Sequence, residues 1–133
     1  MNKVIDKLAW LYIADNKLLH ARSKNKVLFY LPGGKRETGE TDQQALTREI
    51  KEEVSVDLIA SSIKYAETFE APADGENADV TVKLTCYFAD FEGQLTPAAE
   101  IADIKFIDVQ NKALCSLGSI KVIEWLKSQE LLR

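Results

Sequence analysis

The chain has 133 residues, which is enough for one hydrophobic core and too few for two, so we expect a single domain spanning residues 1–133. A formal net charge of −4 without a basic stripe argues against binding a nucleic-acid polymer. No apolar run approaches the ~18 residues of a membrane span. Cys86 and Cys115 match no metal-ligand spacing, and no secretory signal is evident. We therefore expect a cytoplasmic protein with reduced thiols and no membrane partner.

The first third of the chain is rich in β-prone runs. Their alternation predicts three strands, over residues 7–15, 17–23 and 26–31, with a turn at Asp15–Lys17. Pro32, Gly33 and Gly34 end the third run. His20 stands alone in the second strand, where a structural role is expected.

The rest of the chain alternates helix and strand signals. A helix is predicted from Thr41 or Asp42, both good N-cap residues, to Val54. Further elements are expected as strands over 63–71 and 79–91, a turn across 72–79, a strand over 104–109 and a helix over 119–132. This order predicts an α+β fold with a mixed β-sheet packed between helices.

The first predicted helix carries an unusual distribution of charge. At about 100° per residue, its apolar residues form one stripe, made of Leu46, Ile50 and Val54. Three carboxylates form an arc beside that stripe, from Glu49, Glu52 and Glu53. Arg48 and Lys51 are expected to point away from most of this arc.

This arc opposes helix formation by roughly 0.2–0.5 kcal/mol for each like-charged pair at i,i+3 or i,i+4. A bound Mg²⁺ removes the repulsion, because it prefers hard oxygen ligands. The alternative is that glutamate is only a good helix former on a solvated face. The glycine-rich turn "PGGKRETGE" at fixed spacing before the helix favours the metal interpretation.

This turn and helix resemble the signature of the Nudix hydrolase family, G-x5-E-x7-R-E-U-x-E-E-x-G-U, where U is aliphatic. The matching residues, over 34–56, are Gly34, Glu40, Arg48, Glu49, Ile50, Glu52, Glu53 and Val56. Ser55 stands where the family has glycine. It predicts either a different helix exit or a cost of about 1 kcal/mol. The resemblance implies the family's Nudix fold, an α/β/α sandwich.

The resemblance also implies roles for individual residues. Glu49, Glu52 and Glu53 would bind Mg²⁺ or Mn²⁺ and carry catalysis, with the Gly33 carbonyl as a further metal ligand. Arg48 and Glu40 would orient this carboxylate array and brace the turn.

The remaining roles are implied less directly. The general base would be Glu49 or Glu100, although Glu100 could equally be an exposed loop acid. Gly34 and Lys35 would contact substrate. Arg22 resembles a phosphate-contacting arginine of the family's triphosphatases, and a surface arginine is the alternative.

The substrate implied by the resemblance is a nucleoside diphosphate linked to another group. A short single domain is similar to the MutT-type enzymes, which convert a nucleoside triphosphate to a monophosphate and pyrophosphate. Pro72 favours a second reading, in which ADP-ribose or another nucleoside diphosphate sugar is hydrolysed. A third hypothesis is a catalytically silent domain that binds nucleotides. We expect a small-molecule nucleotide as partner and a monomer or homodimer.

Overall fold

The computed structural model describes residues 3–75 and 79–133, in which strands, two α-helices and two 3₁₀ turns alternate along the chain. The strands are β1 (Lys3–Leu11), β2 (Ile13–Ala14), β3 (Lys17–Ser23), β4 (Gly33–Gly34), β5 (Asp57–Leu58), β6 (Lys64–Pro72), β7 (Val80–Phe88), β8 (Phe91–Glu92) and β9 (Ile101–Ile107). The helical segments are α1 (Asp42–Val54), η1 (Ala60–Ser62), η2 (Val109–Leu114) and α2 (Leu117–Ser128).

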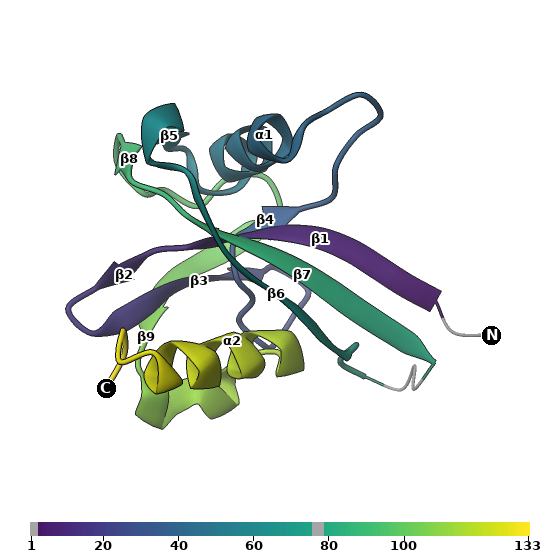
Figure 1. The fold of residues 1–133 in the computed structure, drawn as a ribbon, viewed down its shortest axis with the longest axis vertical. Helices are drawn as coiled ribbons and strands as arrows, with labels where there is room; N and C mark the ends of the chain where they lie inside the picture. Colours follow the sequence, from purple (N-terminus) through teal and green to yellow (C-terminus); the bar gives the residue numbers. More distant parts are fainter. Residues whose placement is uncertain (1–2, 76–78) are drawn as a thin grey trace.

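The strands form a mixed arrangement. The largest sheet has the order β4-β1-β7-β6, in which β1 runs parallel to β7 while β4 and β6 are antiparallel to their neighbours. A second sheet has the order β2-β3-β9, and β5 pairs with β8. Figure 1 shows α1 on one side of these strands and α2 on the other. The predicted α+β sandwich is confirmed. In the described part of the chain no helix is long and apolar enough to cross a membrane.

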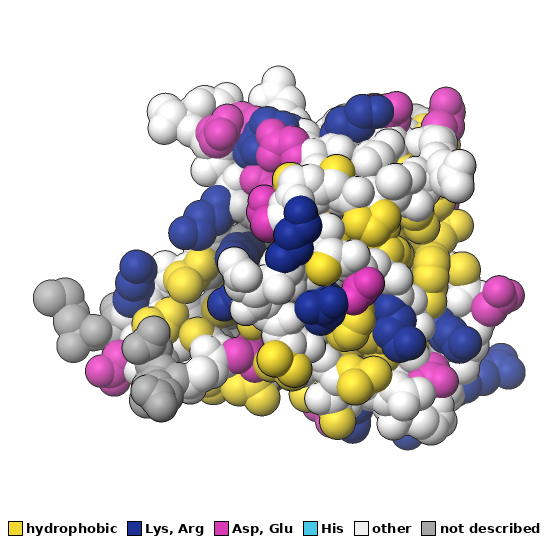
Figure 2. All heavy atoms as spheres, turned by 180° about the vertical axis from the view of Figure 1, so that it is seen from behind, with side chains coloured by type: hydrophobic (Ala, Val, Ile, Leu, Met, Phe, Trp, Pro, Cys, Tyr) yellow, Lys and Arg dark blue, Asp and Glu magenta, His cyan; other side chains and the backbone are white. Residues whose placement is uncertain are grey.

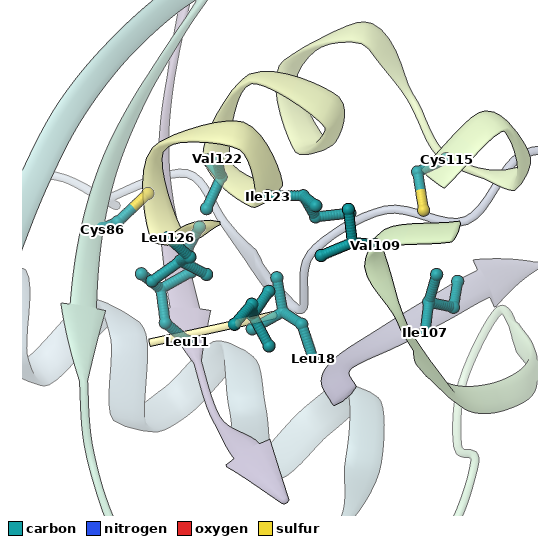
Figure 3. Packing of buried hydrophobic residues seen from close by; sticks show 11 residues of the cluster. Leu11, Leu18, Cys86, Ile107, Val109, Cys115, Val122, Ile123 and Leu126 are labelled. Atoms are coloured by element: carbon teal, nitrogen blue, oxygen red, sulfur yellow. The ribbon is translucent and has the colours of Figure 1, made fainter. Parts of the chain in front are cut away.

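The hydrophobic core has two layers because the last four residues of β1, Leu8–Leu11, are buried on both faces. Leu8 and Trp10 pack with the residues of α1, whereas Ala9 and Leu11 pack with those of α2. This alternation follows from the two-residue period of a strand. Figure 3 shows the α2 layer, to which both cysteines contribute as free thiols. This end of β1 thus lies between α1 and α2.

The bounds predicted for α1 are confirmed. Thr41 is the N-cap, and its hydroxyl accepts the N–H of Gln44 while the Gln44 side chain accepts the N–H of Thr41. Ser55 ends the helix in the left-handed conformation, with φ of 69°. The helix exit typical of glycine is therefore retained with a serine, and the Ser55 hydroxyl donates to the carbonyl of Thr96 at 2.9 Å.

The strand predicted over residues 26–31 is wrong. Phe29 forms a single bridge with Cys115, and Tyr30 forms one with Ala21. Because consecutive residues pair with two different elements, no ladder forms. Val27, at the start of this run, is 89% exposed.

Other bounds differ by a few residues. The first predicted strand begins earlier, at Lys3, and is interrupted after Leu11. Helix α2 starts before residue 119, since Ser116 caps it, and it ends before Glu130, whose φ is 62°. Pro72 closes β6 instead of lying in the following turn. The predicted turn across 72–79 includes residues 76–78, which lie outside the described residues.

Candidate active site

Two carboxylates of α1, those of Glu49 and Glu53, face the glycine pair of β4. Glu53 Oε1 accepts the backbone N–H of Gly33 at 3.0 Å. A Cβ at Gly34 would lie 2.4 Å from the Glu49 carboxyl carbon, so only glycine admits this approach. Glu52 projects further out, with a side chain that is 55% exposed. Figure 2 shows acidic side chains beside lysine and arginine at the top of the molecule, where α1 lies in Figure 1.

Arg48 joins the arc of carboxylates to the turn. Its Nε and Nη2 each donate to Glu40 at 2.8 Å, and Nη2 also donates to the carbonyl of Lys35 at 3.1 Å. Its Nη1 donates to Glu49 at 3.0 Å and lies 3.5 Å from Glu52. This bidentate contact and the Glu37 backbone N–H lower the pKa of Glu40 to about 2.

The expectation that Arg48 points away from the arc is therefore wrong. Its position on the helix does lie on the side away from most of the arc. Its side chain is long enough to bring the guanidinium back to Glu49 and Glu52. Arginine thus offsets part of the like-charge repulsion that the sequence suggested.

Among the carboxylates of residues 3–75 and 79–133, Glu53 has the environment least favourable to charge. Its pKa is raised to about 7, chiefly by burial and also by the nearby charges of Glu49 and Glu100. The hydrogen bond from Gly33 and the ammonium of Lys7 act in the opposite direction. A buried carboxylate with acidic neighbours is a group whose charged form a cation would stabilise.

Glu100 reaches this site through its loop. The N–H of Thr96 donates to the carbonyl of Val54, and that of Ala98 donates to the carbonyl of Glu53, both at 3.0 Å. These two bonds tie the loop to the end of α1. The exposed Glu100 follows immediately, and its charge raises the pKa of both Glu49 and Glu53.

These residues offer the donor type that a hard divalent cation prefers, namely carboxylate oxygens. However, no three acidic, histidine or cysteine side chains among residues 3–75 and 79–133 close into a metal-binding group. Arg48 holds Glu49 and approaches Glu52, while Glu53 is bonded to Gly33. Each of these contacts engages one oxygen of its carboxylate, so each of the three glutamates keeps a second oxygen for a cation.

Two residues predicted to contact substrate make contacts within the protein. Arg22 forms an ion pair with Asp103 and donates to the carbonyl of Lys26 at 3.0 Å. Lys35 has an exposed side chain, and its carbonyl is bonded to Arg48. Neither residue lines the cavity that adjoins Glu53.

This cavity has a volume of about 210 Å³ and extends from the acidic helix to the start of α2. Its polar lining includes Lys7 and Glu53 at one end, and Tyr30, Asp74 and Ser119 at the other. Sequence patterns did not indicate Lys7 or Asp74, because they come from β1 and from the connection after β6. Only the packing of these segments brings them together.

Comparisons with known proteins show which sequences and folds this chain resembles. The NUDIX domain model matches residues 8–126. An ADP-ribose pyrophosphatase of Methanocaldococcus jannaschii is 30% identical over 113 residues, which are 83% of this chain and 65% of that protein. The solution structure of the E. coli ORF135 protein has a TM-score of 0.74 at 23% identity, over 97% of this chain and 92% of that one.

A third relative adds a ligand-bound example of the fold. It is the bifunctional NMN adenylyltransferase/ADP ribose pyrophosphatase of Francisella tularensis, solved with AMP and a manganese ion. Its TM-score is 0.71 at 21% identity, over 97% of this chain and 42% of that one. Both structural likenesses concern the fold, and the family match spans most of the sequence. This chain belongs to the Nudix hydrolase family.

Proposed function

We propose that this protein is a Mg²⁺- or Mn²⁺-dependent pyrophosphohydrolase that converts a nucleoside triphosphate to a monophosphate and pyrophosphate. Water adds across the anhydride between the α and β phosphorus atoms. The observation that carries the proposal is the cavity beside Glu53 and Gly33. Its volume of about 210 Å³ falls below the roughly 300–1,000 Å³ of sites that enclose a whole drug-sized ligand. It therefore suits one organic moiety.

Some residues of the chain would hold the divalent cation, and another would keep the turn in position beside them. Glu49, Glu52 and Glu53, with the carbonyl of Gly33, would bind the divalent cation. When bound, that cation would neutralise phosphate charge and lower the pKa of a water. Arg48 would keep the turn on the helix through its bonds to Glu40 and the Lys35 carbonyl.

Two further groups complete this proposed arrangement. Lys7 lines the cavity beside Glu53, where its ammonium can meet a phosphate. Glu49 and Glu100 remain the two candidates for the general base. Gly34 and Lys35 would contact the substrate from the glycine-rich turn. Arg22 would have to break its ion pair with Asp103 before it could reach the substrate.

ADP-ribose is the second candidate substrate. The archaeal relative is an ADP-ribose pyrophosphatase, and this chain covers 65% of its length. Pro72 lines the cavity, which gives that residue a position at the site. ADP-ribose carries two organic halves, so it needs a second binding surface beyond the cavity.

The test is a comparison of kcat/KM for all common ribo- and deoxyribonucleoside triphosphates and for ADP-ribose, with Mg²⁺ present. We expect at least one triphosphate to exceed ADP-ribose by tenfold or more, which corresponds to ~1.4 kcal/mol of transition-state binding. Products would be separated chromatographically, and pyrophosphate identifies the expected bond. A higher kcat/KM for ADP-ribose than for every triphosphate would reject the proposed substrate.

The proposed cation site makes a prediction about stability. At a hundredfold excess over its dissociation constant, Mg²⁺ should stabilise the native protein by about 2.7 kcal/mol. The expected rise in Tm is on the order of 5–10 °C. The rise should be much smaller in Glu52→Gln, because one carboxylate ligand is lost, and calorimetry would measure both.

A matched control is Glu124→Gln, which removes one exposed carboxylate from α2 in the opposite layer. It should keep the full response to Mg²⁺. Equal rises in Tm for Glu52→Gln and Glu124→Gln would place the cation elsewhere.

A further inference from the structure

The end of the cavity remote from Glu53 has the properties of a selective site. We propose that Asp74 selects nucleobases that carry an exocyclic amino group, by accepting the amino N–H at the α2 end of the cavity. This inference rests on the proposed function, since the diphosphate would lie at Glu53 and the attached moiety would fill the remaining space. The supporting contacts involve Asp74, Ser119, His20 and Tyr30.

Asp74 is fixed by the beginning of α2. Its Oδ1 accepts the backbone N–H of Leu117 at 3.0 Å, which is one of the N–H groups without a partner inside the helix. An ionised carboxylate has about four lone-pair sites, and this bond uses one. The carboxylate is thus held in place while most of its acceptor capacity is free for a ligand.

The hydroxyl of Ser119 is also restricted to accepting. His20 is fully buried, and its Nδ1 lies 2.9 Å from the carbonyl of Leu18, which can only accept, so the proton sits on Nδ1. The Nε2 then carries a lone pair and accepts a hydrogen bond from the hydroxyl of Ser119. Burial lowers the pKa of His20 to about 4, so this neutral tautomer persists at neutral pH.

The backbone N–H of Ser119 donates to the hydroxyl of Ser116 at 3.2 Å, so this contact leaves the Ser119 hydroxyl oxygen free. The proton of that hydroxyl is engaged with His20. What Ser119 can still offer to a ligand in the cavity is a lone pair.

The other residues that line the cavity are compatible with a flat nucleobase that carries an amino group. Leu31, Val82 and Leu84 supply apolar walls. Burial raises the pKa of Tyr30, and the adjacent charge of Asp74 raises it further, so its hydroxyl stays neutral beside that carboxylate. Lys26 also lines the cavity, but it is exposed and its ammonium can remain in water.

The experiment uses triphosphate pairs that differ at the amino position, namely CTP with UTP and GTP with ITP. The most active triphosphate should carry the amino group and exceed its partner at least tenfold in kcat/KM. Asp74→Asn should reduce this ratio below threefold. The asparagine oxygen can keep the bond to Leu117, while its NH₂ opposes the amino donor. Asp79→Asn is the matched control, because Asp79 is exposed, follows in the same β6–β7 connection and does not line the cavity.

Two kinetic results would overturn the inference. One is UTP or ITP as the best substrate, and the other is an Asp74→Asn variant that folds and keeps the parent ratio. Calorimetric binding of CMP, UMP, GMP and IMP separates this question from catalysis. A tenfold preference for an amino-bearing monophosphate without any triphosphate turnover would reject the proposed function and keep the role of Asp74. Equal affinities within both pairs would reject that role.

Discussion

Glu53→Gln is expected to lower divalent-dependent turnover by at least a thousandfold while leaving the fold intact. Cation stabilisation of developing phosphate charge is worth several kcal/mol, and about 4 kcal/mol corresponds to that factor. Glutamine keeps an oxygen that can accept the Gly33 N–H at the position of Glu53 Oε1. Turnover at saturating Mg²⁺ and at saturating Mn²⁺, with circular dichroism as a check of folding, would measure the effect.

The same substitution should stabilise the cation-free protein at alkaline pH. Burial raises the pKa of Glu53 to about 7, so between pH 4.5 and 7 the native state holds a proton that the unfolded chain has lost. This contribution to stability is present below pH 4.5 and is lost as pH rises through 7. At pH 8 the parent carries the charged, buried carboxylate at a cost of up to about 3 kcal/mol.

Denaturant unfolding in EDTA at pH 5 and pH 8 would test whether Glu53→Gln stabilises the protein at the higher pH. The difference in unfolding free energy, variant minus parent, should increase from pH 5 to pH 8. Glu124→Gln, on the opposite helix, should show no such trend. Unchanged turnover in Glu53→Gln would contradict the cation site, whereas a flat pH dependence would contradict only the burial of charge.

Local patterns predicted α1 well because its determinants lie within the helix itself. Thr41 caps it, Leu46, Ile50 and Val54 form the buried stripe, and the bounds follow. The family signature is likewise one short segment of turn and helix. Its fixed spacing predicted that Arg48 and Glu40 act together, and the two side chains are bonded to each other.

Features that depend on distant pairing could not be predicted in this way. Residues 26–31 have strand-like composition, but their partners are Ala21 and Cys115, on opposite sides in sequence. The direction of the Arg48 guanidinium depends on side-chain length and on Glu40, which a helical projection ignores. Tyr30 and Asp74 share a cavity wall only because β6 ends beside the start of α2.

The two glycines of β4 are needed for different reasons. Gly33 is needed for folding, and Gly34 is needed for the proposed cation site. A Cβ on Gly33 would lie 2.0 Å from the carbonyl oxygen of Leu8, which is backbone of the paired strand and cannot move aside. Its φ of 151° adds strain for any L side chain. Gly33→Ala should therefore destabilise the protein by about 3 kcal/mol or more, at the upper end of single substitutions.

Gly34→Ala should behave differently although its contact is also too close. The Cβ would lie 2.4 Å from the Glu49 carboxyl carbon, at the end of a flexible side chain that can rotate away. We expect a loss of stability within about 1 kcal/mol, because only the contact of Glu49 with Arg48 is disturbed. Turnover should still fall at least tenfold, since Glu49 leaves the proposed cation site.

Urea unfolding and Mg²⁺-dependent turnover of both variants would show the contrast. A Gly33→Ala protein as stable as the parent would contradict the close pairing of β4 with β1. A fully active Gly34→Ala protein would remove Glu49 from the proposed chemistry and leave Glu100 as the general base.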